Sequence, residues 1–211
     1  MDLVATVSTA LEAQLGPRWA GRTAVLPSGV AMERFRPLPR GDARQALGLD
    51  PDEPCLLFPA DPARPTKRHD RAMEVAGDVR LLSLGDVDPA QVPLWVNAAN
   101  AVLVPSDAEG FGLAVLEALA CDVPVLATPV GNHPDALAGI AGTLCAPFDA
   151  GIWRAAVAPH LRHGDPRVAG RERAGRWGAD RMALRVVDAW TELLAREGTA
   201  GGGNGRRRLP G

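Results

Sequence analysis

Several residue types that mark whole classes of protein are scarce in this sequence. Its 211 residues include three cysteines, which are too few and too scattered for a disulfide framework or a Cys-x-x-Cys metal site. No apolar run approaches the roughly 20 residues of a membrane-spanning helix. The N-terminus has no basic segment and does not resemble a signal peptide. We therefore expect a cytoplasmic protein with reduced cysteines and no transmembrane segment.

A charge excess of either sign is also absent. The 25 acidic and 23 basic residues leave a net charge of −2, so we expect no nucleic-acid partner. The basic residues are 22 arginines and one lysine, Lys67. A position that keeps a lysine against this bias is a candidate site for a compact ammonium charge. The arginines between residues 162 and 185 are interspersed with acidic residues and are predicted to form a solvated face, with a contact to anionic lipid or nucleic acid as the alternative.

Short apolar runs alternate with helical segments through the middle of the chain. Runs that are apolar throughout are typical of strands covered on both faces, and the alternation predicts an α/β fold with a doubly wound parallel sheet. In such sheets ligands bind beyond the carboxyl ends of the strands, here the loops after Phe58, Leu84, Val104 and Ala127. Strands are predicted at 3–7, 24–26, 55–58, 79–84, 101–104, 123–127 and 143–145. Helices are predicted at 8–15, 43–47, 68–75, 92–99, 112–121, 134–138, 150–161, 167–177 and 179–196.

One predicted strand-to-helix loop combines three features that suit a phosphorylated ligand. Gly110 and Gly112 flank Phe111, and glycine lets the backbone approach a ligand closely. The helix that starts near Leu113 offers free backbone N–H groups and the positive end of its dipole. Glu117 is an isolated carboxylate in an apolar helix, so we expect it to face the crevice, where ligand hydroxyls can satisfy it.

Two carboxylates are predicted to share this crevice. Glu109 precedes Glu117 by eight residues, which in a helix places them about 80° apart around the axis. Vicinal hydroxyls of a ribose or a glycan suit such acceptors, because one carboxylate can accept two O–H groups. The alternatives are that Glu117 faces solvent and that Glu109 is a loop acid near a helix N-terminus.

The segment EGFGLAVLE, residues 109–117, resembles the E-x7-E motif of retaining GT-B glycosyltransferases of family 4. The resemblance covers most of residues 21 to 140. It includes segments similar to the family's interdomain turn (26–37), to its first strand and basic loop (57–67), and to the stretch that follows the motif (118–135). It implies the Rossmann-like C-terminal domain of a GT-B enzyme, which binds a nucleotide diphosphate sugar.

The resemblance implies a role for each candidate residue. Glu117 would bind the ribose hydroxyls, and Glu109 would contact the transferred sugar. Lys67, with Arg64, would neutralise the leaving diphosphate, because a fixed cation stabilises charge that builds on the leaving oxygen. Val87 would pack on the base. The backbone that would hold the sugar and the diphosphate is that of Gly110, Phe111, Gly112 and Leu113. No metal and no further cofactor is implied.

The chain departs from the family pattern at several positions. Asp61 stands where the family has an arginine, and Arg64 is expected to substitute for it. Asp122 replaces a usual glycine, which is tolerable because aspartate visits the left-handed region. The short stretch between Lys67 and Gly85 indicates that one strand–helix unit is missing. No histidines share a metal-ligand spacing. We expect His133 to be a solvated loop residue, and the alternative is that it contacts the nucleotide-sugar donor.

The resemblance also divides the chain. Residues 1–20 correspond to a remnant of the N-terminal acceptor domain, which is otherwise largely missing. Residues 21–196 correspond to the nucleotide-sugar-binding domain with its C-terminal helices, and residues 197–211 to a disordered tail. The last helix carries an apolar stripe that in the family would cross onto the acceptor domain, so we expect it to be exposed or repacked.

The predicted function is donor binding for a UDP-, GDP- or ADP-sugar and transfer of the sugar with retention of configuration. An acceptor-domain chain is the expected partner, since the sequence looks like a truncated part of such an enzyme. A nucleotide-sugar-binding module without catalytic activity is the alternative. A dehydrogenase is disfavoured because no G-x-G-x-x-G follows an early strand.

Overall fold

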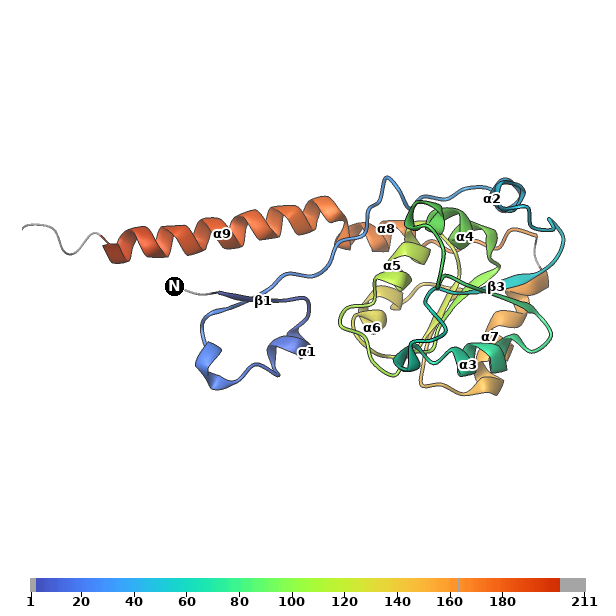
Figure 1. Cartoon of the computed structure of the whole chain (residues 1–211), viewed down its shortest axis with the longest axis horizontal. Helices are drawn as coiled ribbons and strands as arrows, with labels where there is room; N and C mark the ends of the chain where they lie inside the picture. The colour runs from blue at the N-terminus through green and yellow to red at the C-terminus, as the bar shows by residue number, and fades with distance from the viewer. Residues whose placement is uncertain (1–2, 163, 202–211) are drawn as a thin grey trace, which may run out of the picture.

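The strands of the chain form two separate parallel sheets (Figure 1). The computed structural model describes residues 3–162 and 164–201, the last six of these by their backbone alone. In the larger sheet the order is β4-β3-β5-β6-β7, and all neighbouring strands are parallel. This confirms the predicted α/β fold with a parallel sheet. The five strands are Cys55–Phe58 (β3), Arg80–Ser83 (β4), Ala101–Val104 (β5), Val125–Ala127 (β6) and Leu144–Cys145 (β7).

Helices follow the strands as the alternation predicts. The described α-helices are Thr9–Glu12 (α1), Arg40–Leu47 (α2), His69–Ala76 (α3), Val92–Ala98 (α4), Leu113–Ala120 (α5), His133–Leu137 (α6), Ala150–Arg162 (α7), Arg171–Ala174 (α8) and Ala179–Gly201 (α9). The 3-10 turns are Pro17–Trp19 (η1), Pro65–Lys67 (η2), Pro89–Gln91 (η3) and Gly175–Trp177 (η4). Gly48 ends α2 in the left-handed conformation, as expected for a helix C-terminus.

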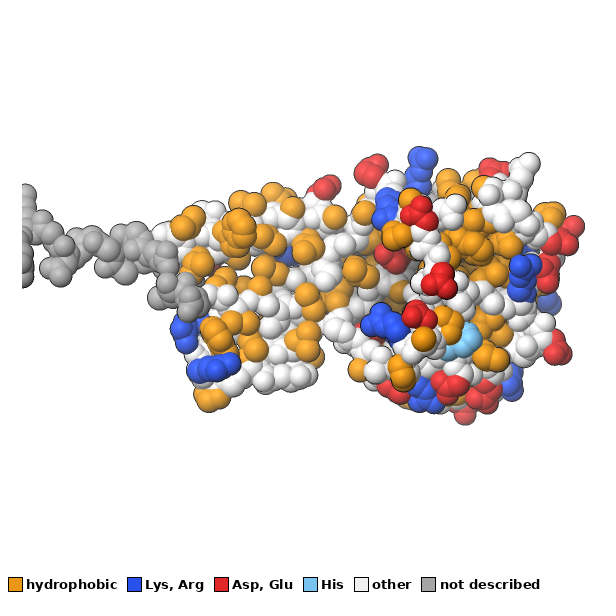
Figure 2. All heavy atoms as spheres, in the orientation of Figure 1, with side chains coloured by type: hydrophobic (Ala, Val, Ile, Leu, Met, Phe, Trp, Pro, Cys, Tyr) orange, Lys and Arg blue, Asp and Glu red, His pale blue; other side chains and the backbone are white. Residues whose placement is uncertain are grey.

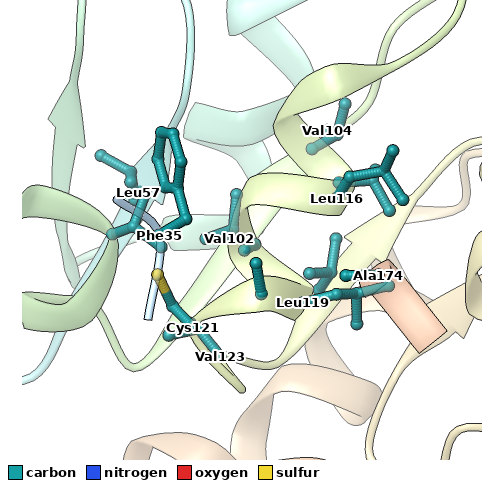
Figure 3. Close-up of a cluster of buried hydrophobic side chains, with 14 of the residues drawn as sticks. Phe35, Leu57, Val102, Val104, Leu116, Leu119, Cys121, Val123 and Ala174 are labelled. Carbon is teal, nitrogen blue, oxygen red and sulfur yellow. The ribbon is translucent and has the colours of Figure 1, made fainter. Parts of the chain in front are cut away.

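Helices cover both faces of the larger sheet, and successive side chains of a strand point to opposite faces. Leu56 and Phe58 of β3 belong to one apolar cluster, which also contains buried residues of α3 and α7. Leu57, between them, belongs to a second cluster with buried residues of α4 and α5 (Figure 3). Every residue of β3, β5 and β6 is buried, which explains why these strands read as continuous apolar runs.

The N-terminal strands pair with each other and form a small sheet, separate from the larger one. The strands Val4–Thr6 (β1) and Thr23–Val25 (β2) pair in parallel as a two-stranded sheet beside α1. Ser8 begins α1, since its hydroxyl accepts a hydrogen bond from the backbone N–H of Leu11 at 3.3 Å. The division of the chain at residues 20 and 196 stays a prediction.

The segment between β2 and α2 is fastened to the start of α9. The backbone N–H of Val30 donates to the carbonyl of Trp177 at 2.8 Å, and that of Ala179 donates to the carbonyl of Val30 at 2.9 Å. Two arginines hold the same segment to α5. Arg171 donates to the carbonyls of Phe35 and Ala120. The predicted solvated face is therefore wrong for Arg171.

The predicted solvated face is also wrong for Arg167. Its guanidinium donates to the carbonyls of Leu38 and Cys121. With Arg171 it thus places positive charge at the C-terminal end of α5, where cations offset the negative end of the helix dipole. The guanidinium suits this role because its fork of N–H donors can bind two carbonyls at once.

The helix predicted at 167–177 begins four residues later than expected. The carboxylate of Asp122 accepts the backbone N–H groups of Gly170 and Arg171 at 3.0 and 2.7 Å, which caps α8 at Arg171. Asp122 itself has a φ of 55°, in the left-handed region that the sequence analysis expected for it. A Cβ on Gly170 would lie 2.8 Å from Leu119, so the chain passes close to α5 here.

The last helix continues beyond its predicted end. α9 runs to Gly201, so residues 197–201 are helical and the predicted disorder is wrong for them; residues 202–211 lie outside the described part of the chain. The expected apolar stripe is exposed, and Figure 2 shows hydrophobic side chains along α9. Each side chain of the stripe is more than half exposed: Leu184, Val187, Trp190 and Leu194.

We predict that Asp122→Ala destabilises the chain more than Asp122→Gly does. Both variants lose the two hydrogen bonds that cap α8, at a cost of about 1–3 kcal/mol. Alanine additionally has to adopt a positive φ, which costs roughly 1 kcal/mol more than glycine. Urea unfolding of the three proteins gives both differences. Equal stability of the two variants would contradict the strained-backbone component.

Candidate functional site

Two loops meet at the point where the strand order reverses. β3 and β5 are neighbours in the sheet, and the chain leaves them toward opposite edges. Crevices at such reversal points are the usual ligand sites of doubly wound sheets. The backbone N–H of Asp107, after β5, donates to the carbonyl of Thr66, after β3, at 2.9 Å. This hydrogen bond holds the two predicted site loops together.

Lys67 and Glu109 form an ion pair across this junction. The Lys67 ammonium donates to both carboxylate oxygens of Glu109, each at 2.7 Å. The side chains are only 18% and 9% exposed. Ser106 Oγ donates to Glu109 Oε1, also at 2.7 Å. The structure thus brings together two of the residues that the sequence predicts for the site, one from each loop.

A chain of hydrogen bonds connects this pair to the loop after β6. Thr128 Oγ1 donates to the carbonyl of Ser106 at 2.6 Å, and His133 Nδ1 lies 2.8 Å from the carbonyl of Thr128. Since a carbonyl only accepts, His133 carries its proton on Nδ1. Its side chain is fully buried, so the prediction of a solvated loop is wrong. Burial lowers the pKa of His133 and keeps the imidazole neutral.

Glycine is required at Gly112, the second of the two glycines that flank Phe111, and at Gly131 in the loop after β6. Gly112 has a φ of 107°, and a Cβ there would lie 2.5 Å from His133 Nε2. Gly131 has a φ of 57°, and its Cβ would lie 2.5 Å from the carbonyl oxygen of Phe111. Neither position accommodates a side chain. The loops after β5 and β6 are therefore in direct backbone contact.

The N-terminus of α5 is open to a ligand. No side chain caps this helix at Gly112. Among the described residues, the backbone N–H groups of residues 110–113 donate no loop hydrogen bond. The Phe111 side chain is buried in the core, whereas Leu113 at the helix start is exposed. Such an uncapped end presents N–H donors and a positive dipole end to an anion.

Glu117 lies on α5 without a neutralising partner. Its side chain is half-buried, and burial raises the pKa of its carboxyl group, an effect that the charge of Arg34 opposes. The described residues donate no hydrogen bond to this carboxylate. Arg34 belongs to the segment between β2 and α2. A half-buried acceptor without donors is a feature of ligand sites.

The other predicted residues lie at the rim. Arg64 is exposed at the start of η2 and does not join the Lys67–Glu109 pair. Val87 is half-buried in the loop after β4. That loop contacts the one after β3, since a Cβ on Gly85 would lie 3.4 Å from Asp61 Oδ1. The loops after β4, β3, β5 and β6 thus follow one another along one edge of the sheet.

Sequence reasoning missed a second charge cluster and the support behind the site. Arg68 and Arg71 both bind the carboxylate of Asp107, at 3.2 and 2.8 Å. Ser106 and Thr128 were not singled out, although Ser106 precedes Glu109 by three residues in the same loop. That spacing was the one available signal. Thr128 lies in another loop, and no local pattern connects it to the site.

The crevice around the pair is nearly closed. The cavity beside it has a volume of about 10 Å³, close to the space for one water molecule. Its walls include Phe58, Ala60, Ser106 and Ala114. A larger depression of about 630 Å³ lies over α6 and β7, and none of the predicted site residues lines it.

Two kinds of feature are absent from the described residues. They contain no group of three or more histidine, cysteine, aspartate or glutamate side chains placed to hold a metal ion. No helix within residues 3–162 and 164–201 combines the length and the apolar character needed to cross a bilayer.

Comparison with known proteins identifies the family. Residues 58–163, about half of the chain, match the family model described as Glycosyl transferases group 1. The chain belongs to this family. The matched range contains the Lys67–Glu109 pair, the open end of α5 and Glu117. The fold is that of the Rossmann-like C-terminal domain of GT-B glycosyltransferases.

Relatives in the glycosyl transferases group 1 family are longer than this chain. The D-inositol 3-phosphate glycosyltransferase 2 of Catenulispora acidiphila is 31% identical over 221 residues, which cover 82% of this chain and 51% of that protein. The sucrose-phosphate synthase of Thermosynechococcus elongatus is 27% identical, with a TM-score of 0.70 over 92% of this chain and 59% of its own. The chain spans about half the length of the curated relatives it matches.

A further solved structure shows the same fold at lower identity. It is that of Alr3699/HepE from Anabaena, determined in complex with UDP-glucose. It is 18% identical, with a TM-score of 0.72 over 90% of this chain and 64% of its own. At this identity the likeness concerns the fold alone.

We predict that Gly112→Ala is destabilising and that Gly110→Ala, two residues earlier, is tolerated. Alanine at 112 has to adopt a φ of 107° and to place its Cβ against His133, whereas a Cβ at 110 has no atom within 4 Å. The expected loss is roughly 1–3 kcal/mol for Gly112→Ala and under about 1 kcal/mol for Gly110→Ala. Thermal unfolding checks this. Similar melting temperatures for the two variants would contradict the close contact.

Proposed function

We propose that this chain is the donor-binding half of a glycosyltransferase that uses a nucleotide diphosphate sugar. The observation that carries the proposal is the open N-terminus of α5 beside Lys67. Free N–H groups and a cation at one point are what a diphosphate requires. The Anabaena protein that shares this fold was determined in complex with UDP-glucose, a ligand of the same class. No metal is needed in this proposal, because Lys67 and the helix end supply the positive charge.

Each candidate residue has a proposed role in binding and transfer. Glu117 accepts the ribose hydroxyls, since its carboxylate is half-buried and lacks donors. Glu109 accepts hydroxyls of the transferred sugar. The backbone of residues 110–113 holds the diphosphate, and Lys67 stabilises the charge that develops on it when the glycosidic bond breaks. Arg64 at the rim adds positive charge, and Val87 packs on the base.

An acceptor-binding half is the proposed partner. The chain spans about half of its relatives' length, and the exposed apolar stripe of α9 is a surface that such a half would cover. In the complete enzyme the sugar would be transferred with retention of configuration. The described cysteines are unpaired, which fits a reducing compartment such as the cytoplasm. A binding module that transfers nothing is the second candidate, and measuring transfer in the presence of an acceptor half separates the two.

Calorimetric titration of the chain with UDP, GDP and ADP tests the donor site. We expect one of these nucleotides to bind. Replacing Glu117 by alanine should weaken that binding by about 10- to 100-fold, the range for hydrogen bonds to a charged group. Glu74→Ala is the matched control, since Glu74 is an exposed helical glutamate on α3 and its removal should leave the affinity unchanged. A folded wild-type chain that binds none of the three would count against the donor site.

The pH dependence of binding should report the ionisation of Glu117. Ribose hydroxyls donate to the carboxylate form, so the affinity is full at neutral pH and falls as the pH drops through the pKa of Glu117. Burial raises that pKa, so the loss should begin at a higher pH than for an exposed glutamate. Titrations over about three pH units above the ordinary glutamate pKa of about 4.3 measure this. Glu117→Gln should flatten the profile, and an unchanged profile would contradict the assignment.

A further inference from the structure

In this structure Glu109 is bound to Lys67, the cation that the proposed donor diphosphate requires. Both carboxylate oxygens of Glu109 accept from the Lys67 ammonium at 2.7 Å, and the adjoining cavity has a volume of about 10 Å³. Two of the three ammonium N–H groups of Lys67 are thus taken by Glu109 and little space adjoins the pair, so a diphosphate that binds this cation closely has to take the place of Glu109. Ligand binding therefore includes the exchange of one anionic partner of Lys67 for another.

The neighbouring cations offer no substitute. Arg68 is bound by the carboxylates of Asp70 and Asp107, and Arg71 is bound by Asp107. Arg64 is exposed at the rim and lies outside the Lys67–Glu109 pair, and residues 81–153 contain no arginine or lysine. The diphosphate thus competes with Glu109 for Lys67.

Separating the pair leaves Glu109 in need of new donors. Its side chain is 9% exposed, so water replaces the lost ammonium poorly, and the incoming diphosphate adds like charge beside it. Ser106 Oγ supplies one hydrogen bond to Oε1. A sugar attached to the diphosphate brings hydroxyls that can donate to the freed carboxylate, whereas a bare nucleoside diphosphate brings none to this point.

We propose that the Lys67–Glu109 pair makes the site discriminate between a nucleotide sugar and the nucleoside diphosphate that remains after transfer. This inference rests on the proposed donor site. A nucleotide sugar separates the pair and satisfies Glu109 with its hydroxyls. The product lacks those hydroxyls, so Glu109 binds Lys67 again and displaces the product. Glu109 is then a specificity-determining residue as well as a contact for the sugar.

Titrations of wild-type chain and Glu109→Gln with UDP and with UDP-glucose test this, with the GDP and ADP pairs run in parallel. A neutral amide leaves Lys67 free, so the variant should bind the nucleoside diphosphate about tenfold more tightly than wild type. Its affinity for the nucleotide sugar should not rise, so the preference for the sugar falls. Weaker or unchanged binding of the nucleoside diphosphate by Glu109→Gln would overturn the proposal.

Asp61→Asn is the matched control for net charge. Asp61 lies in the same loop as Lys67 and is exposed, and an asparagine keeps the oxygen that accepts the backbone N–H of Ala63. This variant removes one negative charge from the rim and leaves the Lys67–Glu109 pair in place. It should bind both ligands nearly as wild type does. A gain for the nucleoside diphosphate equal to that of Glu109→Gln would overturn the proposal in favour of a general charge effect.

Two further measurements separate this proposal from the donor site on which it rests. In a Lys67→Met background, Glu109→Gln should no longer tighten binding of the nucleoside diphosphate, and a persisting gain would contradict the pair's role. Lys67 is also the only lysine of the sequence, so a chain labelled with ¹³C-lysine gives one lysine side-chain NMR signal.

That signal should move in the same direction on Glu109→Gln substitution and on addition of the nucleoside diphosphate. If the nucleotides bind and the signal does not respond, the donor site stands and the inference from the pair fails. If neither ligand binds to either protein, the proposed function fails together with the inference.

Discussion

The carboxylate of Glu109 is almost completely enclosed, and the arrangement of the site depends on how its charge is balanced. A buried carboxylate without a partner costs several kcal/mol, so the loop that carries Glu109 must lie where a cation can reach it. Lys67 supplies that cation from the loop after the neighbouring strand. The loops after β3 and β5 are therefore held at one distance. The backbone hydrogen bond from Asp107 to Thr66 is a second connection between these two loops.

The loop after β6 supports this arrangement from behind. Thr128 and His133 connect it to Ser106, which in turn binds Glu109. Gly112 and Gly131 let the two loops touch through their backbones, since a Cβ at either position would overlap the facing loop. The free N–H groups before α5 are consequently presented by a loop with little room to move. A preorganised set of donors binds an anion without a further cost for ordering them.

Arginine and lysine have separate roles in this chain. Arg40 and Arg44 are buried and donate to the carbonyls of Ala99 and Ala98. Arg167 and Arg171 join distant loops in the same way. The planar guanidinium can bind several carbonyl oxygens at fixed angles, which suits a structural connection. The single ammonium instead stands in the crevice, where a compact charge can pass from one anionic partner to another.

Sequence periodicity was sufficient for most of the fold. The central strands β3, β5 and β6 are buried on both faces and therefore read as short apolar runs, and their alternation with helical segments predicted a parallel sheet. The helix at 167–177 was predicted too long, because its start depends on Asp122, a residue about 50 positions earlier in the chain. The tail was predicted disordered from composition, although helical hydrogen bonds continue through Gly201.

The sequence by itself determined which residues are available at the carboxyl ends of the strands. Glycines at 110 and 112, two glutamates eight residues apart and one lysine are visible without coordinates. Only the tertiary structure decided that Lys67 and Glu109 are partners and that His133 is buried, since both contacts join loops far apart in the chain. The physical reason is that burial and charge pairing depend on distances in space. Local sequence patterns report those distances only within a single helix, strand or turn.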